Sequence, residues 1–165
     1  MKFAAQYVVY IIALLAGASW FVRGDGAPDR RIAVYTAFGA AAVSVVVALI
    51  IQHFYVHQRP FVLRPDVTLL LNHSPDASFP SEHTTAAFGM ASGVALYRPR
   101  PGMALAVLAA LTGFARVFVG IHYPFDVIAG AAIGVLAAAA LRCVRPALAW
   151  LDNAIVVRFV PELLR

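Results

Sequence analysis

The sequence predicts an all-α fold, a polytopic membrane bundle of about five transmembrane helices followed by a C-terminal interfacial helix. Hydrophobic residues make up 62% of the 165 residues and charged residues only 13%, too few charges to cover a water-soluble domain of this size. The hydrophobic residues also form long runs between short polar segments, as expected for helices that have lipid as their solvent. The length fits one domain over residues 1–165.

The first three expected spans differ in length. Ala4–Val22 and Ile32–Ile51 carry no charge, and each is long enough to cross hydrocarbon about 30 Å thick, which takes roughly 20 helical residues. The third run, Thr84–Tyr97, is shorter and rich in Gly, Ala and Ser. Small residues allow helices to approach closely, so we expect this helix inside the bundle.

The last two expected spans are Met103–Ile121, which contains Arg116, and Phe125–Leu141, which contains Asp126 near its start. Beyond them, Pro146–Arg165 mixes apolar and charged residues and is interrupted by Pro161. An interfacial helix is therefore expected there rather than a sixth span.

The basic residues predict how the chain crosses the membrane. With five spans, one side receives only Lys2, Arg59 and Arg64 outside the spans. The other side receives Arg23, Arg30, Arg31, Arg98, Arg100, Arg142, Arg145, Arg158 and Arg165. The positive-inside rule makes the arginine-rich side cytoplasmic and places the C-terminus inside. The N-terminus, residues 53–83 and the turn 120–125 then face the exterior, meaning the periplasm or the outer surface.

An alternative interpretation is cleavage of a leader at Ala16-Gly17-Ala18, which resembles a signal-peptidase site and would invert every later span. The charge bias favours the uncleaved arrangement. The net charge of +5 is spread over short loops without a contiguous basic stripe, so no nucleic acid partner is expected. The single cysteine, Cys143, allows no intramolecular disulfide.

Three polar clusters fall at the ends of spans on the predicted outer side. They are His57-Gln58-Arg59-Pro60, Phe79-Pro80-Ser81-Glu82-His83-Thr84, and Arg116 with His122 and Asp126. Ionisable groups within spans are costly and are usually functional, although Arg116 and Asp126 taken alone could be a structural pair. Two histidines, two arginines, a carboxylate and a helix N-terminus are what phosphoryl transfer to a protein nucleophile requires.

Each residue type has a task in that chemistry. Arginine forks bind phosphate oxygens bidentately, and a helix start with Ser81 at its cap offers backbone N–H groups to an anion. A neutral histidine can attack phosphorus, while a carboxylate holds its tautomer and a second histidine protonates the departing oxygen. His122 and Asp126 flank Pro124, which fits the first turn of a helix and allows the carboxylate to reach the ring.

The order and spacing of these residues, from about 52 to 126, resemble the three-part signature of the type-2 phosphatidic acid phosphatase superfamily. The resemblance implies a helical membrane bundle and a metal-independent reaction through a phosphohistidine. It makes His122 the nucleophile, Asp126 its orienting partner and His83 the general acid. It also implies that Arg59, Arg116 and Ser81 with neighbouring amides hold the phosphate, with Gln52, Pro80 and Glu82 completing the predicted substrate-binding set.

Two positions depart from the family pattern. Gln52 stands where the family usually has lysine, and Ala115 where it usually has serine. Gln52 can hydrogen-bond a phosphate but adds no charge, and Arg64 is a candidate for supplying that charge. An impaired enzyme is the alternative that these departures leave open.

Glu82, together with Arg59-Pro60-Phe61-Val62, resembles the bacitracin-resistance type of undecaprenyl-diphosphate phosphatase. The resemblance implies an isoprenyl diphosphate substrate that is cleaved to the lipid monophosphate and inorganic phosphate. Glu82 could also serve only to cap its helix. Alternative substrates are phosphatidylglycerol phosphate, phosphatidic acid or lipid A. A transport or resistance protein with the same bundle is the alternative from another class.

A zinc site is not expected, and no cofactor is required. His53, His57 and His73 lie in or near the predicted outer loop, but their spacing matches no standard zinc motif.

Overall fold

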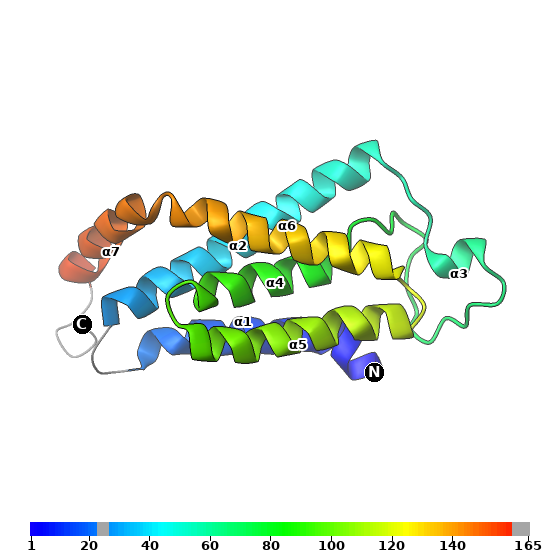
Figure 1. Cartoon of the computed structure of the whole chain (residues 1–165), viewed down its shortest axis with the longest axis horizontal. Coiled ribbons are helices and arrows are strands. Elements are labelled where there is room, and N and C mark those ends of the chain that lie inside the picture. Colours follow the sequence, from blue (N-terminus) through cyan, green and yellow to red (C-terminus); the bar gives the residue numbers. More distant parts are fainter. Residues whose placement is uncertain (23–26, 160–165) are drawn as a thin grey trace.

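The computed structural model describes residues 1–22 and 27–159, and α-helices form most of this part of the chain. The helices are α1 (Lys2–Ala18), α2 (Ala27–Phe54), α3 (Pro60–Leu63), α4 (Glu82–Ala95), α5 (Pro99–Phe118), α6 (Pro124–Arg142) and α7 (Arg145–Phe159), with a 3-10 turn η1 (Ser19–Phe21) after α1. The helices α1, α2, α4, α5 and α6 form an elongated bundle (Figure 1). The short α3 and its loops lie at one end of this bundle, and α7 lies at the other end (Figure 1).

Within residues 1–22 and 27–159, four helical segments are long and apolar enough to cross a membrane: Lys2–Phe21, Asp29–Phe54, Pro99–Phe118 and Pro124–Arg142. The polytopic helical class is therefore confirmed, but the fifth expected span is not among these segments. That helix, α4, has 14 residues and is about 21 Å long, shorter than the hydrocarbon of a bilayer. Residues 96–98 form the short connection from its C-terminal end to α5.

The short helix α4 lies inside the bundle, where it contacts α1, α2, α5 and α6. Small residues make this possible. A Cβ atom at Gly93 would lie 2.5 Å from the Cα atom of Ala37 in α2. A Cβ atom at Gly134 of α6 would lie 2.5 Å from the carbonyl oxygen of Thr85 in α4. Both distances are too short for a side chain, which confirms that small residues determine the packing of this helix.

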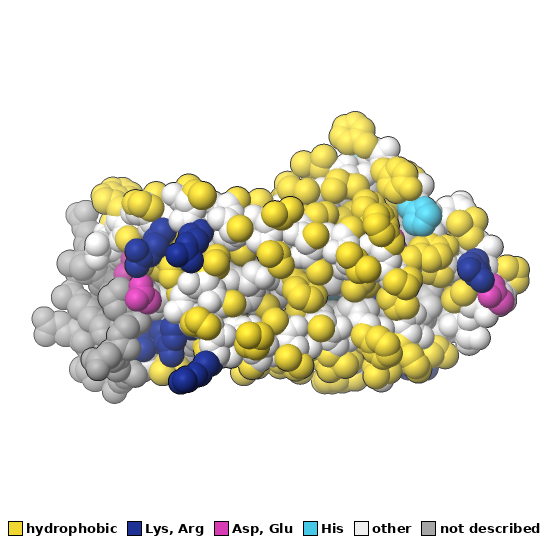
Figure 2. Space-filling view, in the orientation of Figure 1, with side chains coloured by type: hydrophobic (Ala, Val, Ile, Leu, Met, Phe, Trp, Pro, Cys, Tyr) yellow, Lys and Arg dark blue, Asp and Glu magenta, His cyan; other side chains and the backbone are white. Residues whose placement is uncertain are grey.

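The outer surface of the bundle is apolar (Figure 2). Leu14, Phe114, Ile128 and Leu136 each have more than half of their surface exposed, while Ile12 on the opposite face of α1 is fully buried. Exposed large apolar side chains on α1, α2, α5 and α6 are what lipid-facing helices require, since these residues would be unfavourable in water.

Prolines and a glycine set the ends of the last two long helices. Pro124 is in the first turn of α6, as the sequence predicts. The helix α5 begins at Pro99, earlier than the expected Met103, because prolines are tolerated in a first turn that needs no N–H donors. It ends at Phe118, earlier than the expected Ile121, because Gly120 has a positive φ of 82° and turns the chain.

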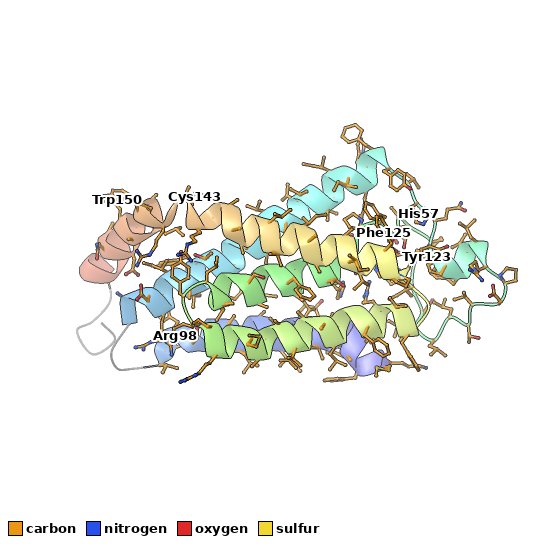
Figure 3. All side chains as sticks on the ribbon, viewed as in Figure 1. His57, Arg98, Tyr123, Phe125, Cys143 and Trp150 are labelled. Carbon is orange, nitrogen blue, oxygen red and sulfur yellow. The ribbon has the colours of Figure 1, made fainter. Side chains whose placement is uncertain are left out.

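The arginine-rich end of the bundle is the end that carries α7 (Figure 2). There the Arg31 guanidinium donates to both carboxylate oxygens of Asp152, at 2.8 and 2.9 Å, and fastens α7 to the start of α2. Arg98, which is labelled in Figure 3, lies at this end too, far from the labelled His57. The helix α7 is not among the candidate spans. The interruption that the sequence predicts at Pro161 lies outside the described residues.

Candidate active site

The three polar clusters of the sequence meet at the end of the bundle that carries α3. A cavity of about 90 Å³ lies there. It is lined by Arg59, Glu82, His83, Arg116 and His122 of the predicted set and by His73 and Asp76. The structure therefore brings together five residues that are up to 63 positions apart in the chain, Arg59 to His122 being the widest pair.

His122 lies in the short loop between α5 and α6 and is only 2% exposed. Its Nδ1 atom faces Oδ2 of Asp126 at 3.4 Å. The same carboxylate oxygen accepts a hydrogen bond of 2.8 Å from the backbone N–H of Tyr123, which ties Asp126 to the start of α6. The expectation that Asp126 reaches back to the His122 ring from the first helical turn agrees with this geometry.

Two arginines converge on the other nitrogen of the same ring. Nη1 of Arg59 lies 3.2 Å from Nε2 of His122, and Nη2 of Arg116 lies 3.1 Å from it. Guanidinium groups only donate hydrogen bonds, so Nε2 is the acceptor and Nδ1 carries the proton toward Asp126. The unprotonated nitrogen thus lies where two arginine forks meet, the position at which an anion would bind.

The surroundings keep His122 neutral. Burial lowers the pKa of His122 to about 4, and the neighbouring Arg116 and Arg59 charges act in the same direction, while the hydrogen bond with Asp126 opposes them. A neutral imidazole with a free lone pair is the form that a nucleophile requires.

Both arginines are buried and held by several partners. Arg59 is 3% exposed and donates to the carbonyl oxygens of Ile121, at 2.9 Å, and Ala77, at 3.1 Å. Arg116 is 4% exposed and donates from Nη1 to the carbonyl oxygen of Ala5 in α1 at 3.3 Å. These bonds fix the two guanidinium groups before any ligand arrives, which reduces the entropy lost on binding.

Asp76, in the loop before α4, pairs with Arg59. Its Oδ1 atom accepts from Nε of Arg59 at 2.7 Å and lies 2.6 Å from Nη2. Ser74 donates to its Oδ2 atom at 2.7 Å. Burial opposes ionisation, yet the bonds from Ser74 and Arg59 leave the pKa of Asp76 below its usual value. A charged carboxylate therefore occupies the outer edge of the Arg59 fork.

Ser78 is a site residue that sequence reasoning missed. Its hydroxyl donates to Oδ2 of Asp126 and lies 3.4 Å from Nδ1 of His122. Its backbone N–H donates to the carbonyl oxygen of His57 at 2.7 Å, next to the single bridge that pairs Gln58 with Ala77. In the sequence, only the position of Ser78 directly before the cluster that begins with Phe79-Pro80 could have indicated a role in the site, because a serine in a loop has no other distinguishing pattern.

Three residues of the predicted substrate-binding set do not line the cavity. Ser81 caps α4 by position, but it is fully buried, its hydroxyl pairs with that of Thr84 at 3.0 Å, and its N–H donates to the carbonyl oxygen of Asp126. Pro80 is also fully buried, and its carbonyl oxygen accepts from the Gln52 amide at 3.1 Å. These three residues hold α2, α4 and α6 together beneath the site.

An aromatic rim lies beside the cavity at the start of α6. The rings of Phe79 and Phe125 stack with centroids 5.4 Å apart, and His57 contacts Tyr123 at 5.1 Å. Figure 3 shows His57, Tyr123 and Phe125 gathered at this end of the bundle. His57 and His53 thus lie away from the cavity, and among residues 1–22 and 27–159 no three His, Cys, Asp or Glu side chains are grouped as metal ligands.

Known proteins resemble this chain in sequence and in structure. A family model described as the PAP2 superfamily matches residues 31–150. The "Bacitracin transport permease protein BcrC" of Bacillus licheniformis is 34% identical over 92% of this chain and 73% of its own. The "Undecaprenyl-diphosphatase BcrC" of Bacillus subtilis (strain 168) is 32% identical over 82% of this chain and 68% of its own. The crystal structure of Aquifex aeolicus LpxE has a TM-score of 0.66 and 26% identity, and covers 83% of this chain and 77% of that one.

Proposed function

The chain belongs to the PAP2 superfamily of lipid phosphatases, and we propose that it hydrolyses undecaprenyl diphosphate to undecaprenyl phosphate and inorganic phosphate through a phosphohistidine. One observation carries the mechanism: Nε2 of His122 faces the guanidinium groups of both Arg59 and Arg116, at 3.2 and 3.1 Å. A phosphate bound by these two arginines takes over their hydrogen bonds from Nε2 and has its phosphorus next to this unprotonated atom. The relative named as an undecaprenyl-diphosphatase supports the substrate.

In the first step, Nε2 of His122 attacks the terminal phosphorus, and the P–O bond to the bridging oxygen breaks as the N–P bond forms. Burial and the Arg116 charge lower the pKa of His83, in the same cavity, to about 3. His83 therefore takes up a proton together with the diphosphate anion, whose charge offsets that of Arg116, and gives this proton to the departing lipid phosphate. Asp126 accepts the Nδ1–H bond and stabilises the positive charge that develops on the ring. Arg59 and Arg116 balance the charge on the oxygens in transfer.

In the second step, water attacks the phosphohistidine. His83, now without its proton, accepts a proton from this water, and the N–P bond breaks to release inorganic phosphate. Glu82 lies beside His83 in the cavity wall, where it can hydrogen-bond a protonated phosphate oxygen. Gln52, Pro80 and Ser81 act through position, because their contacts hold the start of α4.

The test is phosphate release by purified protein in detergent, with undecaprenyl or farnesyl diphosphate and with a chelator of divalent metals present. We expect turnover by the wild type and a loss of at least about a thousandfold in His122→Ala, since a nucleophile is removed. His53→Ala is the matched control, because His53 lies outside the cavity and contacts Phe54. A His122→Ala variant with near wild-type activity would refute the mechanism.

The substrate is tested separately from the mechanism. Phosphatidylglycerol phosphate, phosphatidic acid and lipid A are offered beside the isoprenyl diphosphates in one assay, and we expect the highest kcat/KM for the diphosphates. A higher kcat/KM for one of the other lipids would keep the phosphatase and replace its substrate.

A transport function is the second candidate, because one relative is named a bacitracin transport permease. It predicts that cells keep their bacitracin tolerance when His83 and His122 are replaced by alanine. The phosphatase proposal predicts that tolerance and phosphate release disappear together.

A further inference from the structure

A second cavity adjoins the active site on the side of α1. Its volume is about 240 Å³, larger than the 90 Å³ of the first. The two cavities share His73, His83 and Arg116, while His122 lines only the first. The added wall comes from Gln6, Tyr7 and Tyr10 of α1 and from Leu71 and Asn72. No residue of α1 belongs to the predicted site.

The position of the second cavity matches that of a leaving group. In phosphoryl transfer the attacking and leaving atoms lie roughly in line on opposite sides of phosphorus. His122 lies on one side of the first cavity, and the shared wall carries His83, the proposed proton donor to the leaving oxygen. A group that departs from His122 past His83 enters the second cavity.

The lining of the second cavity suits a phosphate. The side-chain amides of Gln6 and Asn72 and the hydroxyl of Tyr10 are neutral hydrogen-bond donors. Arg116 lines both cavities and adds positive charge to the wall between them.

We propose that this second cavity binds the lipid-linked phosphate of a diphosphate substrate, with Gln6, Tyr10 and Asn72 as its neutral donors and Arg116 shared between the two phosphates. The proposal rests on the proposed diphosphatase function. The lipid chain leaves the cavity past Tyr7, which is 50% exposed on the same outer surface as the 59% exposed Tyr10. The first turns of α1 thereby distinguish a diphosphate from a simple phosphate ester.

The experiment measures binding, so that its result does not depend on turnover. Wild-type protein in detergent is saturated with orthovanadate to fill the first cavity and titrated calorimetrically with farnesyl phosphate. Gln6→Leu and Tyr10→Phe are each expected to bind farnesyl phosphate about tenfold more weakly, the loss expected for one hydrogen bond to a charged group. The affinity for inorganic phosphate alone is expected to change less than twofold in both variants.

Tyr97→Phe is the control, because Tyr97 lines a different cavity at the opposite end of the bundle. The proposal is overturned if vanadate-loaded wild type does not bind farnesyl phosphate. The proposal is also overturned if both variants bind farnesyl phosphate as tightly as the wild type does. It is overturned as well if their affinity for inorganic phosphate falls by the same factor as their affinity for farnesyl phosphate. Failure of the diphosphatase function has a different signature, the absence of phosphate release from farnesyl diphosphate by the wild type.

Discussion

Ser78 donates its hydroxyl proton to the Asp126 oxygen that also faces Nδ1 of His122. The serine thus fixes the carboxylate from the side of the 55–81 loop, while the Tyr123 N–H fixes it from α6. The orientation of His122 therefore depends on both segments. In the proposed mechanism, a carboxylate held in one position keeps the proton on Nδ1 and the lone pair on Nε2.

Ser78→Ala is expected to lower kcat about tenfold with little change in KM, because the serine orients Asp126 and does not reach the cavity. Ser78→Thr, which keeps the hydroxyl, should recover part of the loss. Steady-state phosphate release from farnesyl diphosphate measures both constants. Ser92→Ala, at a half-buried position in the last turn of α4, is the control. A rise in KM alone would show that Ser78 contacts substrate.

Asp76→Asn is expected to strengthen the binding of inorganic phosphate about threefold to fivefold. The carboxylate now competes with an anion for Nε and Nη2 of Arg59, and a partly exposed pair of this kind is worth up to about 1 kcal/mol. Product inhibition by phosphate measures the change, with Asp66→Asn, in an exposed pair with Arg64, as the control. Weaker phosphate binding in Asp76→Asn would mean that the carboxylate positions Arg59 for the ligand.

The pKa of His122 should be measurable directly. In protein labelled with ¹³C at histidine Cε1, one signal should titrate near pH 4, far below the ordinary value of 6.5, and should vanish in His122→Gln. Between pH 6.5 and 4, the His122 imidazole binds a proton in the unfolded chain and does not in the folded chain. The contribution of His122 to the free energy of unfolding is therefore complete above pH 6.5 and decreases as the pH falls toward 4. A titration near 6.5 would show that neither burial nor the arginines affect the ring.

The sequence predicts the parts of the site that lie at helix ends. Arg116, His122 and Asp126 are placed by the end of α5, the turn at Gly120 and the first turn of α6, so their spacing alone determines that they meet. Their chemistry could be inferred because charged groups stand out against apolar runs.

The contributions of the loop and of α1 could not be inferred in the same way. Residues 55–81 contain only the short helix α3, so no periodicity indicates that Ser78 and Asp76 face inward. Gln6 and Tyr10 are uncharged residues of a span and look like ordinary interfacial side chains. For Gln52 the motif predicts a substrate-binding residue, but this residue does not line the cavity. Its amide donates to the Pro80 carbonyl oxygen instead.

Gly134→Ala is expected to destabilise the bundle. The added Cβ would lie 2.5 Å from the Thr85 carbonyl oxygen and 2.6 Å from the Gly89 nitrogen, both in the backbone, so α4 and α6 would have to separate. Overpacking of this kind costs about 1–3 kcal/mol. Thermal unfolding in detergent should show a lower midpoint. Gly17→Ala is the control, since its nearest contact would be 3.7 Å away on Phe38, and an unchanged midpoint in Gly134→Ala would contradict the tight α4–α6 contact.

The direction in which the bundle crosses the membrane can be tested with the single free cysteine, Cys143, replaced by serine. The arginines at the end opposite the site support an outward-facing active site, by the positive-inside rule. Asp66→Cys, exposed near α3, should react with a membrane-impermeant maleimide in intact spheroplasts. Arg100→Cys should react only after permeabilisation. The reverse pattern would place the site in the cytoplasm, where a lipid diphosphate would have to be cleaved at the inner leaflet.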